Sequence, residues 1–292
     1  MRRYRNILVG VDGSQPGFHA LEEAIRLAQW GKGGVAVIHV APSYEGDLSL
    51  VGVRNIRAVV RGPGEQILSE AVEIAESHDF SIRTIYDEGK VHERIVHHAM
   101  ARDVDLVVLG ARRTLSMALF CLGNVATRVV HLCPADVMAI PDQAPIGWEK
   151  ILFAFESSKC GKDVAARVIE LAVIHGGELR TLSVKHSFLG SIRKVPIGKE
   201  CLSRRNAIEC LESIHMQADH AGVRNEGILW CGRFHRVVAK VAEEQNINMA
   251  IIELNGRMRP VWGFGRSIIG RTIGSAPCPL LFLGPNRINA AT

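Results

Sequence analysis

Three segments of the first half of this chain return in the second half at a nearly constant spacing. The spacing is 144 positions for the first pair and 143 for the other two, and the pairs are Tyr4–Ser14 with Trp148–Ser158, Gly89–His92 with Gly232–His235, and Asp105–Gly110 with Asn248–Glu253. A spacing that drifts by one residue over half a chain indicates a duplicated domain. We therefore expect two copies of one fold, at residues 1–143 and 144–292.

Length and composition agree with two domains of ordinary size. A chain of 292 residues allows each copy its own core, and 47% hydrophobic and 22% charged residues are usual for a globular protein. No apolar run approaches the roughly 18 to 20 residues that span a bilayer. Met1–Asn6 resembles the start of a secretory signal, but Asp12 interrupts the apolar stretch behind it. We expect a cytoplasmic protein with no membrane span.

The cysteines and histidines do not form a metal or disulfide pattern. The seven cysteines are odd in number and include no Cys-x-x-Cys pair, which argues against a disulfide framework or a zinc ribbon. Two pairs, His131 with Cys133 and Cys231 with His235, miss the spacings of known metal sites. We expect no bound metal, and we expect buried thiols.

The net charge of +5 is mild, but its distribution is uneven. Residues 254–292 contain five arginines and no acidic residue, and residues 106–135 contain three arginines and no acidic residue. Both stretches follow the last strand-like run before the end of a repeat, where an anion could be held; a solvated basic loop is the alternative. Aromatic residues amount to 5% and do not alternate with basic ones, so nucleic acid is not an expected partner.

Short β-branched runs alternate with helical patterns in both halves. In the first half we expect strands at 6–11, 35–40, 81–86, 105–109 and 136–140, with helices at 15–30, 65–77, 93–102 and 123–132 between them. In the second half we expect strands at 150–155, 179–184, 223–230, 249–252 and 280–283. Two irregular segments, 41–61 and 185–199, follow the second strands, and Pro141–Pro145 is the expected linker. This alternation predicts an α/β protein with two doubly wound, five-stranded parallel sheets.

The site is expected where ligands bind in open parallel sheets, at the carboxyl ends of the strands where the winding reverses. Asp12, Val40 and the loop that begins at Gly110 should meet there. The loop leads to a helix that starts at Gly123 and Asn124, and a glycine-preceded helix N-terminus offers unpaired N–H groups to a phosphate.

The chain resembles a tandem member of the universal stress protein family. The resemblance rests on Ile7–Ser14, on the strand ending Ile38-His-Val40 and on Asp105–Gly110, and it covers both halves. It implies a five-stranded doubly wound fold of the adenine nucleotide alpha hydrolase type. It also implies ATP binding in a subset of members, through Gly-2x-Gly-9x-Gly-Ser/Thr after the fourth strand, with the aspartate after the first strand holding adenine.

The first half keeps part of this motif. Gly110 and Gly123 match the first and third glycines, Arg113 replaces the second, and Asn124 replaces the final Ser or Thr but keeps a hydrogen-bonding side chain. Arg113 could either block the backbone surface or pair with a phosphate. Together the two halves give these candidate nucleotide-binding residues: Asp12, Val40, Gly110, Arg112, Arg113, Gly123, Asn124, Val125, Gly256 and Ser267.

The second half departs further from the motif. Gly256 and Ser267 match, but Glu253 stands where the first glycine belongs and Glu156 replaces the aspartate. A carboxylate beside a phosphate is repelled by roughly 1 to 4 kcal/mol, so we expect an altered second pocket. His92 and His235 recur without a Ser or Cys partner at the start of a helix, and we interpret them as structural.

Three functions remain open at this stage. The first is a regulatory protein that binds ATP, or AMP or ADP, in its first half without a dedicated catalytic role. The second is a protein with two degenerate pockets that acts through protein contacts or binds another anion or a lipid. The third is a phosphoester hydrolase, although no Gly-x4-Gly-Lys-Ser/Thr loop is present.

By resemblance, the fifth strands should pair and let one chain imitate a homodimer, which also covers two sheet edges. A further homodimer remains open.

Overall fold

The computed structural model describes residues 4–43, 56–112, 124–156, 161–186, 193–194, 202–253 and 267–284. Its strands are β1 Asn6–Gly10, β2 Gly34–Ala41, β3 Ile82–Glu88, β4 Leu106–Ala111, β5 Asp136–Pro141, β6 Lys150–Glu156, β7 Glu178–His186, β8 Arg193–Lys194, β9 Asn225–Gly232, β10 Met249–Ile252 and β11 Leu280–Phe282. Its helices are α1 Gln15–Gly31, α2 Ile56–Ser77, α3 Val91–Ala101, α4 Asn124–Leu132, α5 Lys162–His175, α6 Leu202–His220, α7 Phe234–Glu244 and α8 Ile268–Ser275.

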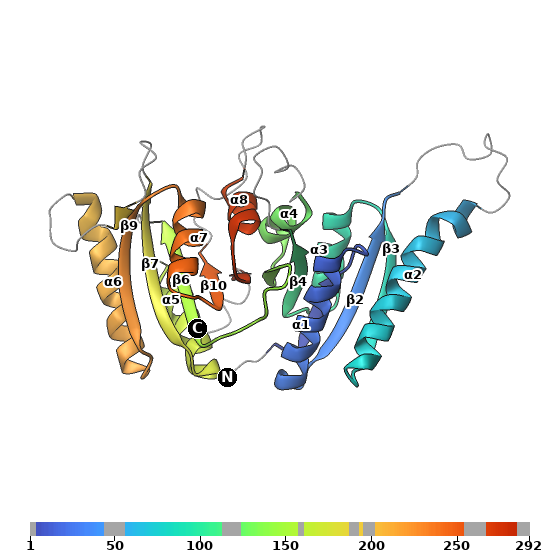
Figure 1. Cartoon of the computed structure of the whole chain (residues 1–292), viewed down its shortest axis with the longest axis horizontal. Coiled ribbons are helices and arrows are strands. Elements are labelled where there is room, and N and C mark those ends of the chain that lie inside the picture. Colours follow the sequence, from blue (N-terminus) through green and yellow to red (C-terminus); the bar gives the residue numbers. More distant parts are fainter. Residues whose placement is uncertain are drawn as a thin grey trace.

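The strands form one continuous sheet in the order β3-β2-β1-β4-β5-β11-β10-β6-β7-β9-β8. The first five belong to the first half of the chain and the rest to the second half (Figure 1). Pairing is parallel within each half apart from β8, which runs antiparallel to β9. Between the halves β5 pairs antiparallel with β11, with Met138 opposite Leu281. The expected doubly wound α/β fold is confirmed, and the two sheets are joined edge to edge.

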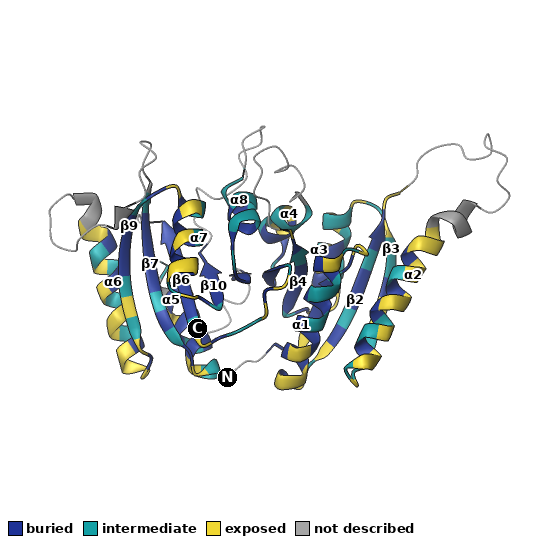
Figure 2. Cartoon of the chain, in the orientation of Figure 1, coloured by how far each residue is buried: buried dark blue, intermediate teal, exposed yellow. Residues whose placement is uncertain are grey.

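Helices cover both faces of the sheet, and a buried apolar cluster lies under each layer. On one face α1, α2, α5 and α6 pack on alternate strand residues such as Val9, Val37 and Phe153. On the other face α3, α4, α7 and α8 pack on the intervening residues such as Leu8, Val107 and Leu152. The central strands are therefore buried on both sides (Figure 2), as a parallel sheet with two helical layers requires.

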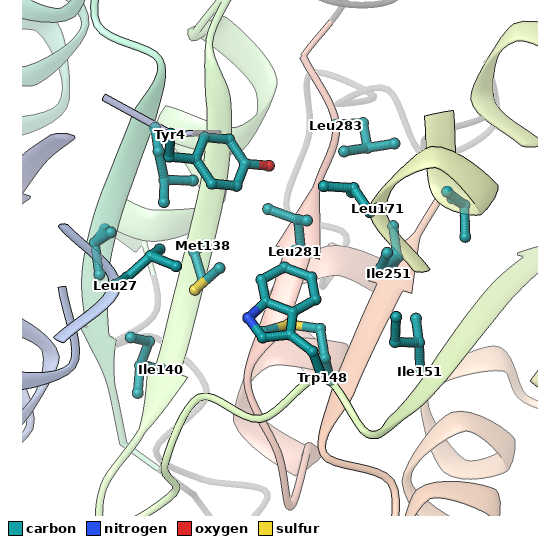
Figure 3. Close-up of a cluster of buried hydrophobic side chains, with 14 of the residues drawn as sticks. Tyr4, Leu27, Met138, Ile140, Trp148, Ile151, Leu171, Ile251, Leu281 and Leu283 are labelled. Carbon is teal, nitrogen blue, oxygen red and sulfur yellow. The ribbon is translucent and has the colours of Figure 1, made fainter. Parts of the chain in front are cut away.

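The apolar contacts continue across the junction of the halves. Met138 on β5, Leu281 on β11 and Trp148 before β6 lie close together in one buried cluster (Figure 3). This burial gives the halves a shared core in addition to their paired strands.

Most predicted elements are confirmed within a few residues, but α2 is an exception. We expected this helix to begin at about Glu65, after Gly62-Pro-Gly64, whereas it begins at Ile56 and contains Pro63. Proline removes one intrahelical hydrogen bond, yet the helix continues through Pro63. Gly64 lies directly over His39 and Tyr86, where a Cβ would come within 2.6 Å of the Tyr86 ring.

The two segments predicted to be irregular are only partly so. Residues 56–61 of the first segment belong to α2, and the short strand β8 lies inside the second. The remaining parts, 44–55, 187–192 and 195–199, lie outside the described residues. In the part of the chain that the structure covers, the helices are all too short or too polar to cross a bilayer.

Candidate functional site at the carboxyl ends of the strands

The winding of the first half reverses between β1 and β4, its central neighbours. Gly10, the last residue of β1, pairs with Ile38 of β2 and with Leu109 of β4. Asp12 and Val40 are each two positions beyond these partners, so both stand at the same edge of the sheet. The structure thus places Asp12 and Val40 at the strand ends beside Gly110, as the sequence predicted.

Asp12 is exposed and its carboxylate is held by the turn that starts α1. Oδ1 of Asp12 accepts hydrogen bonds from the backbone N–H of Ser14 at 3.1 Å and from the Ser14 hydroxyl at 2.5 Å. Gly13 between them has φ +77°, a left-handed conformation that favours glycine. The Ser14 hydroxyl also accepts a bond from Gly17 N at 3.4 Å, so Ser14 is the N-cap of α1. One carboxylate oxygen is thereby oriented by the backbone.

Val40 is buried and belongs to the apolar cluster that includes Leu8 and Leu109. The neighbouring backbone is fixed by two bonds: Val11 N–H donates to the Ile38 carbonyl at 3.0 Å, and His39 Nδ1 lies 3.0 Å from the Val11 carbonyl oxygen. Val40 can therefore contribute backbone groups and an apolar edge to a ligand, while its side chain serves the core.

Gly110 has a packing role that the sequence did not reveal. A Cβ at this position would overlap the Pro16 carbonyl oxygen and lie 2.6 Å from the amide nitrogen of Gly17. The first turn of α1 therefore sits directly on the end of β4, and only a glycine allows this approach. This packing explains the glycine at position 110 without a bound phosphate. A Gly110→Ala substitution would therefore disturb the packing of α1 whether or not a ligand binds there.

The remaining first-half candidates are only partly described. Arg112 follows β4 and is exposed, and Val125 in the first turn of α4 is half-buried against the apolar cluster of that face. Asn124 is the first residue of α4. Its side chain, together with Arg113 and Gly123, lies outside the described residues. The structure thus brings Asp12, Val40 and Gly110 together and leaves the approach of Arg113 to the site untested.

In the second half, a carboxylate lies at the corresponding strand end. Glu253 follows β10 and is 5% exposed. Its Oε1 accepts a hydrogen bond of 2.8 Å from Gly161 N, the N-cap residue of α5. Oε2 is buried and accepts no hydrogen bond from the residues that the structure describes. Glu253 therefore caps α5 from the end of the neighbouring strand, whereas α1 is capped by Ser14 directly before it.

Burial controls the ionisation of this glutamate. It raises the pKa of Glu253 to about 7, while the hydrogen bond from Gly161 acts in the opposite direction. Glu156, at the end of β6, is also buried at 7% exposure, whereas Asp12 at the equivalent position is exposed. Ser267 is the N-cap residue of α8, but its side chain caps no backbone N–H. Gly256 lies outside the described residues.

The recurring histidines are influenced by the charges of recurring arginines. Burial, followed by the charge of Arg128 on α4, lowers the pKa of His92. Burial and the charge of Arg271 on α8 lower the pKa of His235 to about 4. These two arginines are also 143 positions apart, a signal that sequence inspection missed. Neutral histidines packed under a helix fit the structural interpretation made from the sequence.

The helices that lead from the two sites lie side by side across the junction (Figure 1). A Cβ at Gly270 of α8 would lie 3.0 Å from Oγ1 of Thr127 on α4. The first turns of α4 and α8 are therefore neighbours, on the side of the sheet opposite α1 and α5. Within the described ranges, no group of three or more histidine, cysteine or acidic side chains is arranged to hold a metal ion.

Known proteins are similar in sequence to the first half of the chain. Residues 3–141 match the model of the universal stress protein family. Universal stress protein YxiE of Bacillus subtilis is 29% identical over 146 residues, which is 47% of this chain and 99% of that protein. Universal stress protein MJ0531 of Methanocaldococcus jannaschii is 27% identical over 147 residues, covering 47% of this chain and 84% of that protein.

Solved structures match over the whole length. A universal stress protein from Archaeoglobus fulgidus superposes with a TM-score of 0.72 at 18% identity, covering 96% of this chain and 97% of the other. A protein from Pseudomonas aeruginosa, described as a putative universal stress protein, gives 0.62 at 15% identity and covers 99% and 96%. At these identities the likeness shows the fold: both halves together have the architecture of universal stress proteins.

Proposed function

We propose that this chain, whose residues 3–141 form a universal stress protein domain, is a stress-response or regulatory protein that binds an adenine nucleotide in its first half. ATP is the expected ligand, and AMP and ADP are alternatives of the same class. The observation that carries the proposal is the contrast at one structural position. The end of β4 at Gly110 carries no carboxylate, whereas the end of β10 carries Glu253, whose buried carboxylate caps a helix.

The first-half site has the groups that such a ligand needs. Asp12 is exposed, and the bonds from Ser14 orient its carboxylate to accept hydrogen bonds from a base or a sugar. Arg112 is exposed at the end of β4 and offers a charge for a phosphate. By resemblance to the family motif, Gly123, Asn124 and Val125 at the start of α4 would contact the phosphates, with Arg113 reaching over them.

The second half is unsuited to the same ligand. An ionised Glu253 would repel a phosphate by roughly 1 to 4 kcal/mol, and it already satisfies the first N–H of α5. We therefore assign an altered pocket to this half, in spite of Gly256 and Ser267. One nucleotide per chain is the expected stoichiometry.

The domain organisation is part of the proposal. We assign residues 1–143 and 144–292 to two universal stress protein domains in tandem, and the pairing of β5 with β11 supports the view that one chain imitates a homodimer. The paired strands also leave no edge open between the halves. We assign at most weak ATP hydrolysis, since no phosphate loop of the Gly-x4-Gly-Lys-Ser/Thr type is present. We also assign a cytoplasmic location to the chain.

Isothermal titration with ATP tests the proposal. Wild-type protein should bind one ATP with micromolar affinity, and Asp12→Asn should weaken binding by about tenfold, the effect of losing one charged hydrogen bond. Asp219→Asn is the control, because Asp219 is an equally exposed aspartate on α6. The absence of both heat and an ATP-dependent rise in melting temperature would overturn the proposal. It would favour the alternative of degenerate pockets that act through protein contacts or another anionic or lipid ligand.

A further inference from the structure

A cavity lies where the two halves meet, at the end of the strands opposite to the proposed nucleotide site. Its volume is about 750 Å³, within the range of roughly 300 to 1,000 Å³ that small-molecule sites occupy. It is bounded by the last turns of α1 and α5, by residues 146–149 of the segment between the halves, and by the turn between α6 and β9. Both halves contribute to it, so it exists only in the assembled chain.

Three aromatic rings stack along one wall of this cavity. The His175 ring lies 3.9 Å from that of Trp148 at an angle of 7°, and 4.6 Å from that of Trp30 at 24°. Trp148 is 9% exposed and is anchored in the core beside Met138 and Leu281 (Figure 3). Trp30, at the end of the stack, is 44% exposed. The stack therefore begins in the core and ends in an accessible indole.

The duplicated fold does not require this stack. The equivalent positions one repeat away from Trp148, Trp30 and His175 hold Tyr4, Ile174 and Gly31, in that order. These three residues form no aromatic stack. A feature that the fold needed in both copies would be expected in both. The aromatic wall thus has no counterpart at the equivalent positions of the duplicated fold.

Two of the exposed apolar side chains lie at the same place. Five large hydrophobic side chains are exposed among the described residues: Trp30, Met100, Leu132, Val173 and Met216. Trp30 and Val173 both line the cavity. A large exposed apolar surface in a concave site is typical of ligand binding.

The electrostatics of the cavity favour a positive charge. The C-terminal ends of α5 and α6 lie at its wall, at the left-handed residues Gly176 and Gly222, and helix C-termini carry partial negative charge. The charged or titratable side chains on the lining are three carboxylates, two guanidiniums and one imidazole: Glu23, Glu149, Glu178, Arg26, Arg224 and His175.

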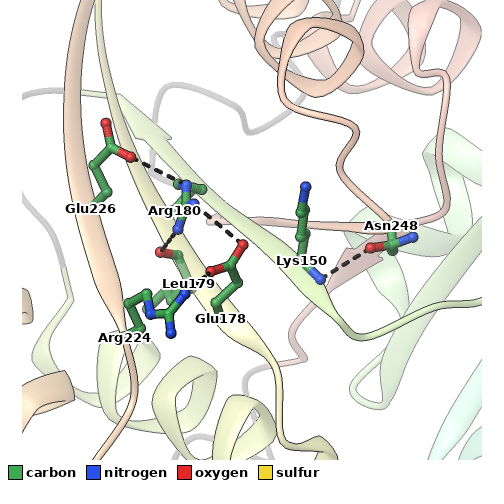
Figure 4. Close-up of polar contacts among 7 residues, drawn as sticks. All are labelled: Lys150, Glu178, Leu179, Arg180, Arg224, Glu226 and Asn248. Carbon is green, nitrogen blue, oxygen red and sulfur yellow. Dashed lines mark hydrogen bonds and ion pairs between the residues drawn. The ribbon is translucent and has the colours of Figure 1, made fainter.

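Both guanidiniums are already paired with lining carboxylates. Arg26 pairs with Glu23, and Arg224 lies 3.3 Å from Glu178, which also bonds Arg180 (Figure 4). Glu149 is exposed and forms no ion pair with any of the described side chains. One carboxylate thus remains beside the aromatic wall.

We propose that this cavity binds a small organic cation with an aromatic or apolar body. The body would lie against Trp30 and Val173, and the ammonium or guanidinium group would face Glu149 and the C-terminal ends of α5 and α6. A cation beside an indole ring also gains a cation–π attraction of about 0.5 to 2 kcal/mol. Neither the strand ends of the nucleotide site nor any of its residues takes part.

A matched pair of probes tests the charge requirement. Tryptamine carries an indole ring and an ammonium group, and tryptophol has the same ring with a hydroxyl in place of the ammonium. Titration calorimetry should show binding of tryptamine, and binding of tryptophol about tenfold weaker. Absence of tryptamine binding, or equal affinity for the two probes, would overturn the proposal.

Substitutions locate the site. Trp30→Ala and Glu149→Gln should each weaken tryptamine binding by about fivefold or more. Met216→Ala and Glu212→Gln remove an exposed apolar group and an exposed carboxylate on α6, away from the cavity, and should leave the affinity unchanged. Melting temperatures confirm that all four variants fold. Unchanged affinity in both cavity variants would overturn the proposal. So would a concentration-dependent dimer that Trp30→Ala dissociates, because a second copy would then cover the cavity.

Discussion

The backbone N–H of Gly284 donates a hydrogen bond of 2.8 Å to Oδ1 of Asp136. The two residues belong to different halves, and Asp136 is fully buried. Its Oδ2 accepts a second bond of 2.7 Å from the Tyr4 hydroxyl and lies 4.0 Å from the Arg167 guanidinium of the second half. Pro279 stands at the equivalent position one repeat later. The buried carboxylate at this junction therefore has no counterpart in the second half.

The Tyr4 hydroxyl should contribute measurably to the stability of this junction. In Tyr4→Phe the ring remains packed, but the buried carboxylate loses one hydrogen bond, which costs about 1 to 3 kcal/mol of unfolding free energy. Urea unfolding at pH 7 measures the loss. Tyr86→Phe is the matched control, because the Tyr86 hydroxyl is buried and forms no hydrogen bond with any described residue. Equal effects of the two substitutions would show that the bond to Asp136 does not stabilise the fold.

The burial of Glu253 makes stability depend on pH. Burial raises the pKa of this carboxyl from 4.5 to about 7, so the folded state favours the protonated form. The resulting stabilisation is complete below about pH 4.5 and is lost as the pH rises through 7. Glu253→Gln keeps an oxygen that can accept from Gly161 and cannot ionise. The variant should therefore gain up to about 3 kcal/mol over wild type at pH 8 and little at pH 5.

Urea unfolding at these two pH values measures the effect, with Glu244→Gln as control. Glu244 is an exposed glutamate near the end of α7, so its substitution should change stability equally at both pH values. A pH-independent difference between wild type and Glu253→Gln would contradict an elevated pKa at this position.

An ion cluster in the first half should have the opposite pH dependence. Oδ2 of Asp87 accepts bonds from Arg94 Nε at 2.6 Å and from His98 Nε2 at 2.7 Å. Burial alone would raise the pKa of Asp87, but these bonds outweigh it and lower the value to about 2. The cluster therefore stabilises the fold above about pH 3.8, and the contribution is lost as the pH falls through 2.

Asp87→Asn removes this contribution. We expect a loss of about 1 to 2 kcal/mol at pH 7, reduced by the partial exposure of Arg94, and a smaller loss near pH 2.5. Asp219→Asn serves as the exposed control on α6. In the second half the equivalent positions hold the apolar residues Trp230, Val237 and Val241. A substitution of one of them should lower stability by the same amount at both pH values, because none of them ionises. Equal losses at both pH values in Asp87→Asn would rule out a charge-based cluster.

The sequence predicted the elements well because their signals are local. The β-branched runs and the helical spacing in each half place β1, α1 and β4 correctly within two residues. The start of α2 was missed, since its packing of Gly64 on His39 and Tyr86 depends on residues far along the chain. The strand-end rule predicted that Asp12, Val40 and Gly110 lie at one edge of the sheet, and their role as a ligand site stays a prediction. The contact of Glu253 with Gly161 joins residues 92 positions apart, and no local pattern reveals it. The cavity at the junction likewise depends on rings from both halves.

The close approach of α1 to β4 predicts a difference between two strand glycines. A Cβ at Gly110 would overlap the backbone of Pro16 and Gly17, whereas a Cβ at Gly34, the first residue of β2, would meet nothing within 4 Å. Gly110→Ala must push α1 away from the sheet and should cost about 1 to 3 kcal/mol of unfolding free energy. Gly34→Ala should be neutral or slightly stabilising, because alanine has less conformational freedom in the unfolded chain. Thermal unfolding without nucleotide measures both variants. Equal melting temperatures would show that α1 does not rest on β4. Packing would then no longer explain the glycine at position 110, and ligand binding would remain as its explanation.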